Sequence, residues 1–300
     1  MSADALARMA RDHPFEVLLD DEGDPPDLPL LRLYGGPLQV RAGTPRVIAN
    51  FVITADGVSA FGDGRGEGAM AVSLHAAADR LVMALLRSAA DCVLIGAGTL
   101  REDTRHQWVP RTLMPDLAGE LAVHRRQLTG SERPPALAVV TTSGSLPATH
   151  PALAQPEAEV LVITTQAGAA RLPSLHPSVR VVTAGAAAAP GSDAIVEAVR
   201  HHLGASTILC EGGPHLFGRL LADGWIDELF LTVAPHLAGR DPDHSRLGLV
   251  EGVAFAPGRT PQLRLRSLRL SGDHLFARYA VTSSPDRAQR LDAGASLSRS

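Results

Sequence analysis

Short apolar runs bounded by turn residues divide the middle of the chain into predicted strands. The first, RVIANFVIT (46–54), is rich in β-branched residues and is closed by Asp56 and Gly57. Because the runs that follow it are apolar throughout, they are typical of strands covered on both faces by helices, as in a parallel sheet. These later runs are DCVLIGAG (91–98), ALAVVTT (136–142), EVLVITT (159–165), VRVVTAG (179–185) and TILCEGG (207–213).

Helical periodicity appears between these runs. Leu81, Leu85 and Leu86 recur at helical spacing, and Ser73 is a good N-cap, so the pattern predicts a helix over 74–89. The remaining predicted helices are a short one after Gly98, one over 192–203 and one over 214–223.

Two connections stand out from the regular pattern. Residues 62–68 (GDGRGEG) are expected to form a flexible loop. Residues 106–135 carry His, Arg, Trp and several Pro between two strands and are longer than most connections, so they are either a lid or variable padding.

The C-terminal part changes character. QLRLRSLRLSG (262–272) alternates between apolar and polar positions, and Ser271-Gly272-Asp273 can close an antiparallel hairpin with HLFARYAVT (274–282). The strand IDELFLTVAPHL (226–237) precedes this hairpin. The chain is therefore predicted to form a parallel sheet that ends in an antiparallel edge.

The pattern predicts one main domain with two flanking segments. Residues 1–44 are rich in Asp, Pro and Gly and carry a single short helical candidate, residues 3–11, so we expect an arm or linker. The domain is expected over 45–282, and the polar tail 283–300 is expected to be disordered.

Composition excludes several classes of protein. The chain is 45% hydrophobic and 20% charged, which excludes global disorder, and no apolar run approaches the roughly 18 residues of a membrane span. The charged N-terminus does not resemble a secretory signal, so we expect a cytoplasmic protein. A net charge of −4 argues against a nucleic-acid partner.

Cysteine and lysine usage narrows the chemistry further. Cys92 and Cys210 lie far apart in apolar runs, which indicates core thiols and neither a disulfide nor a metal site. All 28 basic residues are arginine. The absence of lysine excludes Schiff-base enzymes, pyridoxal phosphate enzymes and Walker-type phosphate loops.

Two glycine turns follow predicted strands. Gly96-Ala97-Gly98-Thr99 ends one strand, and Glu211-Gly212-Gly213-Pro214 ends another and opens a helix with Pro at its first position. Glycines there let backbone N–H groups approach a phosphate, although an isolated turn is more often only a tight connection. If the two strands are neighbours, both turns line one crevice and suit a dinucleotide pyrophosphate.

Taken together, NFVITADG, LHAAADRLVMALLRSAAD, VLIGAGTLRED and ILCEGGPHLFGRLLADGWIDELFLTVAPHLAG resemble the pyrimidine reductase half of the bifunctional deaminase-reductase of riboflavin biosynthesis. The resemblance runs over about 46–282 and implies a dihydrofolate reductase-like, three-layer α/β/α fold. It also implies NADPH as cofactor, hydride delivery to an opened ribosylamine, and a homodimer. The cofactor positions it implies are Ile53, Gly96, Gly98, Thr99, Asp103, Thr142, Ser143, Gly212, Gly213, Pro214, His215 and Leu216.

On the substrate side, the resemblance implies contacts from Ser73, Arg87 and Glu211, with Glu211 and Asp79 as the catalytic candidates. Dihydrofolate reductases place an acid on the helix corresponding to that of Asp79, where it hydrogen-bonds the ring. Each residue also has a structural interpretation. Ser73 would be a plain N-cap, Arg87 a surface ion-pair partner, Glu211 a partner of a helix dipole, and Asp79 a solvated carboxylate.

The chain also departs from the family. Pathway enzymes continue their glycine turn with a stretch of the type D-D-P-x-L-T-V-R, whose Arg helps to hold the substrate phosphate, whereas this chain reads REDTRHQWVPR (101–111). Arg105 and Arg111 are the nearest substitutes. The deaminase zinc pattern is missing, so we expect a stand-alone reductase. Reduction of another heterocycle, such as dihydrofolate, and NADPH binding without catalysis remain as alternatives.

Overall fold

The computed structural model describes residues 2–21, 28–38, 44–62, 68–154, 156–184, 189–243 and 246–283. Its strands are β1 (Glu16–Asp20), β2 (Arg46–Thr54), β3 (Val58–Ala60), β4 (Cys92–Gly96), β5 (Ala136–Thr141), β6 (Val160–Thr164), β7 (Val179–Thr183), β8 (Thr207–Cys210), β9 (Glu228–Ala234), β10 (Leu247–Gly248), β11 (Gln262–Ser271) and β12 (His274–Ser283). Its helices are α1 (Ser2–Asp12), α2 (Pro29–Tyr34), α3 (Gly68–Val72), α4 (Ala77–Ala89), α5 (Ala97–Glu102), α6 (Pro110–Leu113), the 3-10 helix η1 (Pro115–Leu117), α7 (Ala118–Thr129), α8 (Pro151–Ala154), α9 (Gln166–Ala169), α10 (Ser192–Leu203) and α11 (Pro214–Ala222).

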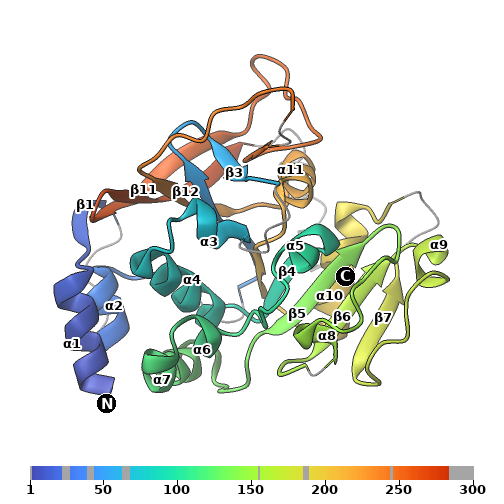
Figure 1. Cartoon of the computed structure of the whole chain (residues 1–300), viewed down its shortest axis with the longest axis horizontal. Coiled ribbons are helices and arrows are strands. Elements are labelled where there is room, and N and C mark those ends of the chain that lie inside the picture. Colours follow the sequence, from blue (N-terminus) through green and yellow to red (C-terminus); the bar gives the residue numbers. More distant parts are fainter. Residues whose placement is uncertain are drawn as a thin grey trace, which may run out of the picture.

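One mixed sheet forms the centre of the molecule (Figure 1). Its strand order is β1-β11-β12-β9-β2-β8-β4-β5-β6-β7. The neighbours from β9 to β7 pair in parallel, whereas β12, β11 and β1 pair antiparallel at one edge. This arrangement confirms the predicted fold class, with a mostly parallel sheet and an antiparallel C-terminal edge.

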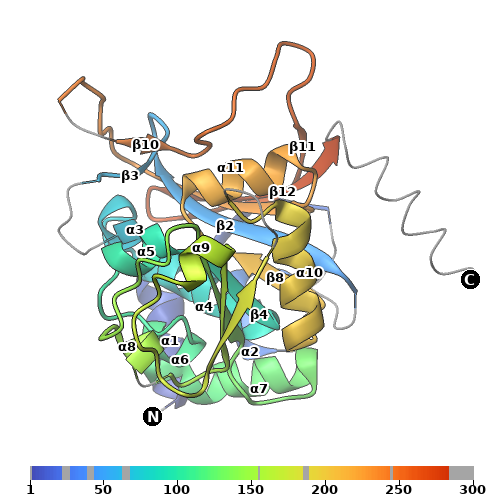
Figure 2. The same cartoon turned by 90° about the vertical axis from the view of Figure 1, so that its right-hand side faces the viewer.

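Helices cover both faces of this sheet (Figure 2). Alternate residues of β4 show how the apolar runs serve two cores. Val93 and Ile95 pack in the core that contains α4, while Cys92 and Leu94 pack in the core that contains α10 and α11. A strand buried on both faces needs an unbroken apolar sequence, which is why these runs do not alternate. Cys92 and Cys210 are buried free thiols, as predicted.

The N-terminal residues differ from the expected arm or linker. β1 pairs antiparallel with β11, and α2 buries Leu30, Leu31 and Tyr34 in the core beside α4. The buried guanidinium of Arg269 lies 3.9 Å from the centre of the Tyr34 ring. The described part of residues 1–44 is therefore packed into the domain. Its partners are distant in sequence, so local composition gave no sign of them.

The first turn of the predicted helix over 74–89 is also different. α4 begins at Ala77, because Leu74 and His75 adopt the left-handed conformation with φ of 54° and 55°. The prediction that Ser73 is the N-cap is wrong, since the Ser73 hydroxyl donates backward to the Met70 carbonyl at 3.2 Å. The preceding residues form the separate short helix α3.

Residues 106–135 are largely helical and contain α6, η1 and α7. Leu113, Leu117 and Leu121 from these helices are buried in the core beside α4. Most of the segment is thus part of the packed structure.

The expected loop at 62–68 and the tail at 283–300 fall almost entirely outside the described residues. In the part of the chain that is described, no helix combines the length and the apolar character needed to cross a membrane.

Candidate functional site

The two glycine turns lie side by side at the carboxyl ends of adjacent strands. β4 and β8 pair in parallel, and the Glu211 N–H donates to the Leu94 carbonyl at 3.0 Å. A Cβ atom on Gly212 would lie 3.2 Å from the Gly96 nitrogen, and one on Gly213 would lie 3.5 Å from the Thr99 hydroxyl oxygen. The predicted adjacency of the turns is therefore confirmed.

The space above the first turn is open. A Cβ atom built on Gly96 or Gly98 would meet no heavy atom within 4 Å. Gly212 differs, because its Cβ would lie 2.6 Å from a methyl carbon of Leu216. Gly212 thus permits close packing within the protein, while Gly96 and Gly98 leave their backbone accessible to a ligand.

A cleft begins at these turns and extends between β2, α3 and α4. Residues not singled out from the sequence also line it, among them Asn50, Ser59, Met83, His106 and Trp108. Of the predicted site residues, those that line it are Asp79, Arg87, Thr99, Asp103, Glu211, Gly212, Gly213 and Pro214.

Arg87 and Glu211 form a buried ion pair in the cleft. The Arg87 Nε donates to Glu211 Oε1 at 3.1 Å and to Oε2 at 2.9 Å, and its Nη2 donates to Oε2 at 2.6 Å. Arg87 is only 2% exposed, which rules out a surface ion pair. Glu211 holds the guanidinium across the gap between α4 and β8, so its carboxylate is not simply a partner of the α11 dipole.

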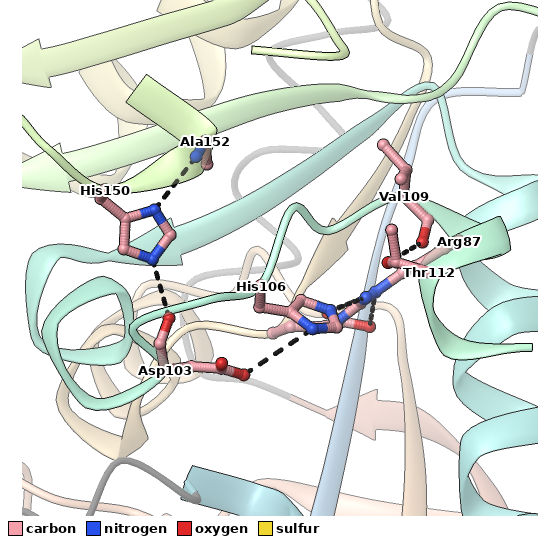
Figure 3. Close-up of polar contacts among 8 residues, drawn as sticks. Arg87, Asp103, His106, Val109, Thr112, His150 and Ala152 are labelled. Atoms are coloured by element: carbon pink, nitrogen blue, oxygen red, sulfur yellow. Dashed lines mark hydrogen bonds and ion pairs between the residues drawn. The ribbon is translucent and has the colours of Figure 1, made fainter. Parts of the chain in front are cut away.

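His106 joins this pair to Asp103. Arg87 Nη1 donates to His106 Nε2, and His106 Nδ1 faces Asp103 Oδ2 at 3.9 Å (Figure 3). Burial and the adjacent Arg87 cation lower the pKa of His106 to about 2. The imidazole is therefore neutral and carries its proton on Nδ1, directed toward the Asp103 carboxyl. Burial raises the pKa of Asp103, while the charge of Arg87 opposes that shift.

Trp108 packs against the rings of both His106 and His150. The Trp108 ring centre lies 5.1 Å from that of His106 and 5.7 Å from that of His150. The Ala152 N–H donates to His150 Nδ1 at 3.1 Å, so His150 Nε2 donates to the Asp103 carbonyl at 2.7 Å. Trp108 has a φ of 54°, a strained value for a bulky residue that the surrounding packing must maintain.

Asp79 is held in a different part of the cleft, on the first turn of α4. It is 5% exposed, so it is not the solvated carboxylate of the structural interpretation. Its carboxyl group hydrogen-bonds to the side chains of Thr232 and Ser73. Burial raises the pKa of Asp79, and the hydrogen bonds and the nearby His274 oppose that shift. A buried carboxyl group with a raised pKa keeps its proton to higher pH than an exposed one does.

The turn between α3 and α4 positions Ser73 against Asp79. Three side chains donate to backbone carbonyl groups at this turn. His236 donates to the Val72 carbonyl at 2.9 Å, His274 to the Ser73 carbonyl at 3.0 Å and Arg80 to the His75 carbonyl at 2.5 Å. These contacts stabilise two consecutive left-handed residues, which would otherwise be costly.

The other sequence-predicted positions do not line the cleft. Thr142 and Ser143 are exposed beyond β5, one strand away from the first glycine turn. Arg105 is exposed and does not line the cleft, and Arg111 pairs with Glu157 at the surface. The remaining positions outside the lining are Ile53, Ser73, Gly96, Gly98, His215 and Leu216.

Sequence reasoning missed His106, Trp108, Thr232 and His274. His106 and Trp108 lie in the segment where the chain departs from the reductase pattern, and that departure was the one available signal. Thr232 and His274 lie on β9 and β12, where no local motif marks them. Among the described side chains, no group of three or more His, Cys, Asp or Glu could hold a metal ion.

Solved structures with this fold include several related reductases. A pyrimidine reductase-like protein from Corynebacterium diphtheriae has 23% sequence identity and a TM-score of 0.57, over 80% of this chain and 93% of its own. The deaminase/reductase of Thermotoga maritima has 17% identity and a TM-score of 0.59, over 80% of this chain and 57% of its own. For Acinetobacter baumannii RibD the identity is 20% and the TM-score is 0.56, over 80% of this chain and 59% of its own.

This chain thus spans less than two thirds of the length of the Acinetobacter and Thermotoga proteins. A search of curated proteins gave no match. The RibD C-terminal domain model matches residues 45–275, which include both glycine turns and the buried Arg87–Glu211 pair. The chain therefore belongs to the RibD C-terminal domain family.

Proposed function

We propose that the chain is an NADPH-dependent reductase of a pyrimidine or pterin-type small molecule, similar to the 5-amino-6-(5-phosphoribosylamino)uracil reductase of riboflavin biosynthesis. The observation that carries this proposal is the convergence of three features in one cleft. Thr99 of the first glycine turn, Gly212 and Gly213 of the second, the Arg87–Glu211 pair and the buried Asp79 all line it.

The glycine turns fit the diphosphate of a dinucleotide. Open space above Gly96 and Gly98 lets a ligand approach the backbone, and the N-terminus of α11 directs its partial positive charge to the same place. Thr99 adds a hydroxyl donor between the turns. NADPH bound here would supply the hydride, with Asp103, Thr142, Ser143, His215, Leu216 and Ile53 as further proposed contacts.

The protein's own groups would orient the acceptor and manage one proton. Asp79 is a candidate to hold and deliver a proton in the cleft because burial raises its pKa. Glu211 is fixed by Arg87 and presents a rigid acceptor edge toward the heterocycle. Ser73 would act through Asp79, since its hydroxyl hydrogen-bonds that carboxyl group.

A second reductase function has one observation in its favour. Neither Arg105 nor Arg111 lines the cleft, so neither substitutes for the Arg that holds the substrate phosphate in pathway enzymes. Reduction of another heterocycle, such as dihydrofolate, is therefore a candidate with the same cofactor. Binding of NADPH without turnover is the outcome expected of a non-catalytic protein.

Assembly and location are proposed from the family resemblance. We expect a homodimer acting in the cytoplasm on a small molecule, without nucleic-acid or membrane partners. Size-exclusion chromatography with light scattering would measure the mass of the particle.

The decisive experiment follows the absorbance of NADPH with 5-amino-6-(5-phosphoribosylamino)uracil, its dephosphorylated form and dihydrofolate as acceptors. Asp79→Asn should lower kcat at least tenfold with the preferred acceptor. Asp116→Asn, a control on an exposed residue, should leave kcat unchanged. Saturable NADPH binding with no oxidation by any acceptor would contradict the enzymatic proposal.

A further inference from the structure

The cation in the cleft is already neutralised by the protein. Arg87 is the one arginine among the described lining residues, and its Nε and Nη2 both donate to Glu211. Its Nη1 donates to His106. A ligand anion would have to displace a buried bidentate carboxylate to reach this guanidinium, which is unfavourable because Glu211 would be left without its partner.

The other described ionisable side chains that line the cleft supply no positive charge. They are the carboxyl groups of Asp79, Glu102 and Asp103 and the neutral imidazole of His106. A phosphate monoester carries a charge of about −1.5 to −2 near neutral pH. Such a group would lose its hydration here without gaining a cationic partner from the described residues.

The neighbouring arginines are directed elsewhere. Arg101 Nη1 donates to the Ser145 carbonyl at 3.1 Å, outside the cleft. Arg111 is paired with Glu157, and Arg105 is exposed without lining the cleft. The segment after α5 thus supplies a carboxyl group and a neutral imidazole to the cleft, and no positive charge.

We propose that the site selects an acceptor that carries no phosphate monoester: an uncharged pyrimidine or pterin-type heterocycle, with or without an unphosphorylated sugar. Asp103 is the specificity-determining residue against the phosphate. This inference rests on the proposed reductase function and narrows its substrate class.

The test compares two ligands that differ only in the phosphate. NADPH oxidation is measured with 5-amino-6-(ribosylamino)uracil and with its 5′-phosphate, and the two values of kcat/KM are expressed as a ratio. We expect the dephosphorylated compound to be preferred at least tenfold. The ratio is internal to each variant, so an effect of the variant on NADPH binding cancels.

Asp103→Asn tests the assigned residue. Removing this carboxyl group should reduce the preference for the dephosphorylated compound at least threefold, whereas the exposed control Asp116→Asn should leave the ratio unchanged. An unchanged ratio in Asp103→Asn would overturn the assignment to Asp103.

A preference of the wild type for the phosphate ester would overturn the inference. If neither compound is reduced although NADPH binds, the proposed reductase function is contradicted, and the inference about the phosphate is tested separately. Calorimetric titration of the same two compounds in the presence of NADP⁺ then decides the inference: tighter binding of the unphosphorylated compound supports it, and tighter binding of the ester, or binding of neither, overturns it.

Discussion

Replacing Arg87 with methionine should be strongly destabilising, because it leaves the Glu211 carboxylate buried without a counterion. In the wild type two of the guanidinium nitrogens contact that carboxylate at 2.6–3.1 Å, and the side chains are 3% and 7% exposed. Opposite unit charges about 4 Å apart attract by about 4 kcal/mol at an effective dielectric constant of about 20. Removing one partner of a buried pair typically costs about 3–5 kcal/mol.

A double-mutant cycle isolates this interaction. Arg87→Met and Glu211→Met are each expected to lower the free energy of unfolding by about 3–5 kcal/mol. The double variant should lose far less than their sum, because two methionines of similar volume can pack together in place of the pair. The expected coupling energy is therefore roughly 3 kcal/mol or more.

Urea unfolding followed by circular dichroism measures all four proteins. The surface pair Arg111–Glu157, whose side chains are 55% and 30% exposed, provides the matched control. The same cycle there should give a coupling energy below about 1 kcal/mol, since water screens exposed charges. Additivity of the Arg87 and Glu211 variants within about 0.5 kcal/mol would refute the reasoning.

Three further predictions concern other parts of the site and fold. Burial raises the folded-state pKa of Asp79, so the stability it contributes is lost as pH rises through that value. Asp79→Asn should gain stability relative to the wild type with rising pH in thermal unfolding, and a constant stability difference would contradict this. Because the wild type loses the Asp79 proton at alkaline pH, its kcat should decline there, and that decline should be missing in Asp79→Asn. Gly212→Ala should cost about 1–3 kcal/mol, because its Cβ would crowd Leu216, whereas Gly98→Ala should fold normally and bind NADPH more weakly by fluorescence titration. Arg269→Met should lower the free energy of unfolding by about 3–5 kcal/mol, because Arg269 contacts Asp20 and the Tyr34 carbonyl in the N-terminal segment. If the variant is as stable in urea as the wild type, the N-terminal segment is dispensable for stability.

The sequence was most informative where a signal is local. Apolar runs gave the strands of the parallel sheet, and the alternating pattern with Gly272 gave the C-terminal hairpin. Glycine turns after β4 and β8 were visible as motifs, and their adjacency followed from parallel pairing. Each of these features depends on residues within one strand or turn, so periodicity and turn chemistry suffice to find it.

Local reasoning failed where distant contacts override propensity. Ser73 has the chemistry of an N-cap, yet His236 and His274 hold its turn in a conformation that delays the helix to Ala77. The acidic, proline-rich composition of residues 1–44 concealed β1, whose partner β11 is far away in the chain. Edge strands of this kind are stabilised by pairing and packing that no short window contains.

The sequence by itself therefore determined the strands of the parallel sheet, the C-terminal hairpin, the two glycine turns and the exclusion of lysine-based chemistry. Only the tertiary structure decided the state of the charges. Arg87 and Glu211 are separated by 124 positions, and their pairing depends on how α4 packs beside β8. Burial and neighbouring charge set the protonation of Asp79, Asp103 and His106, and both are properties of the folded environment rather than of residue type.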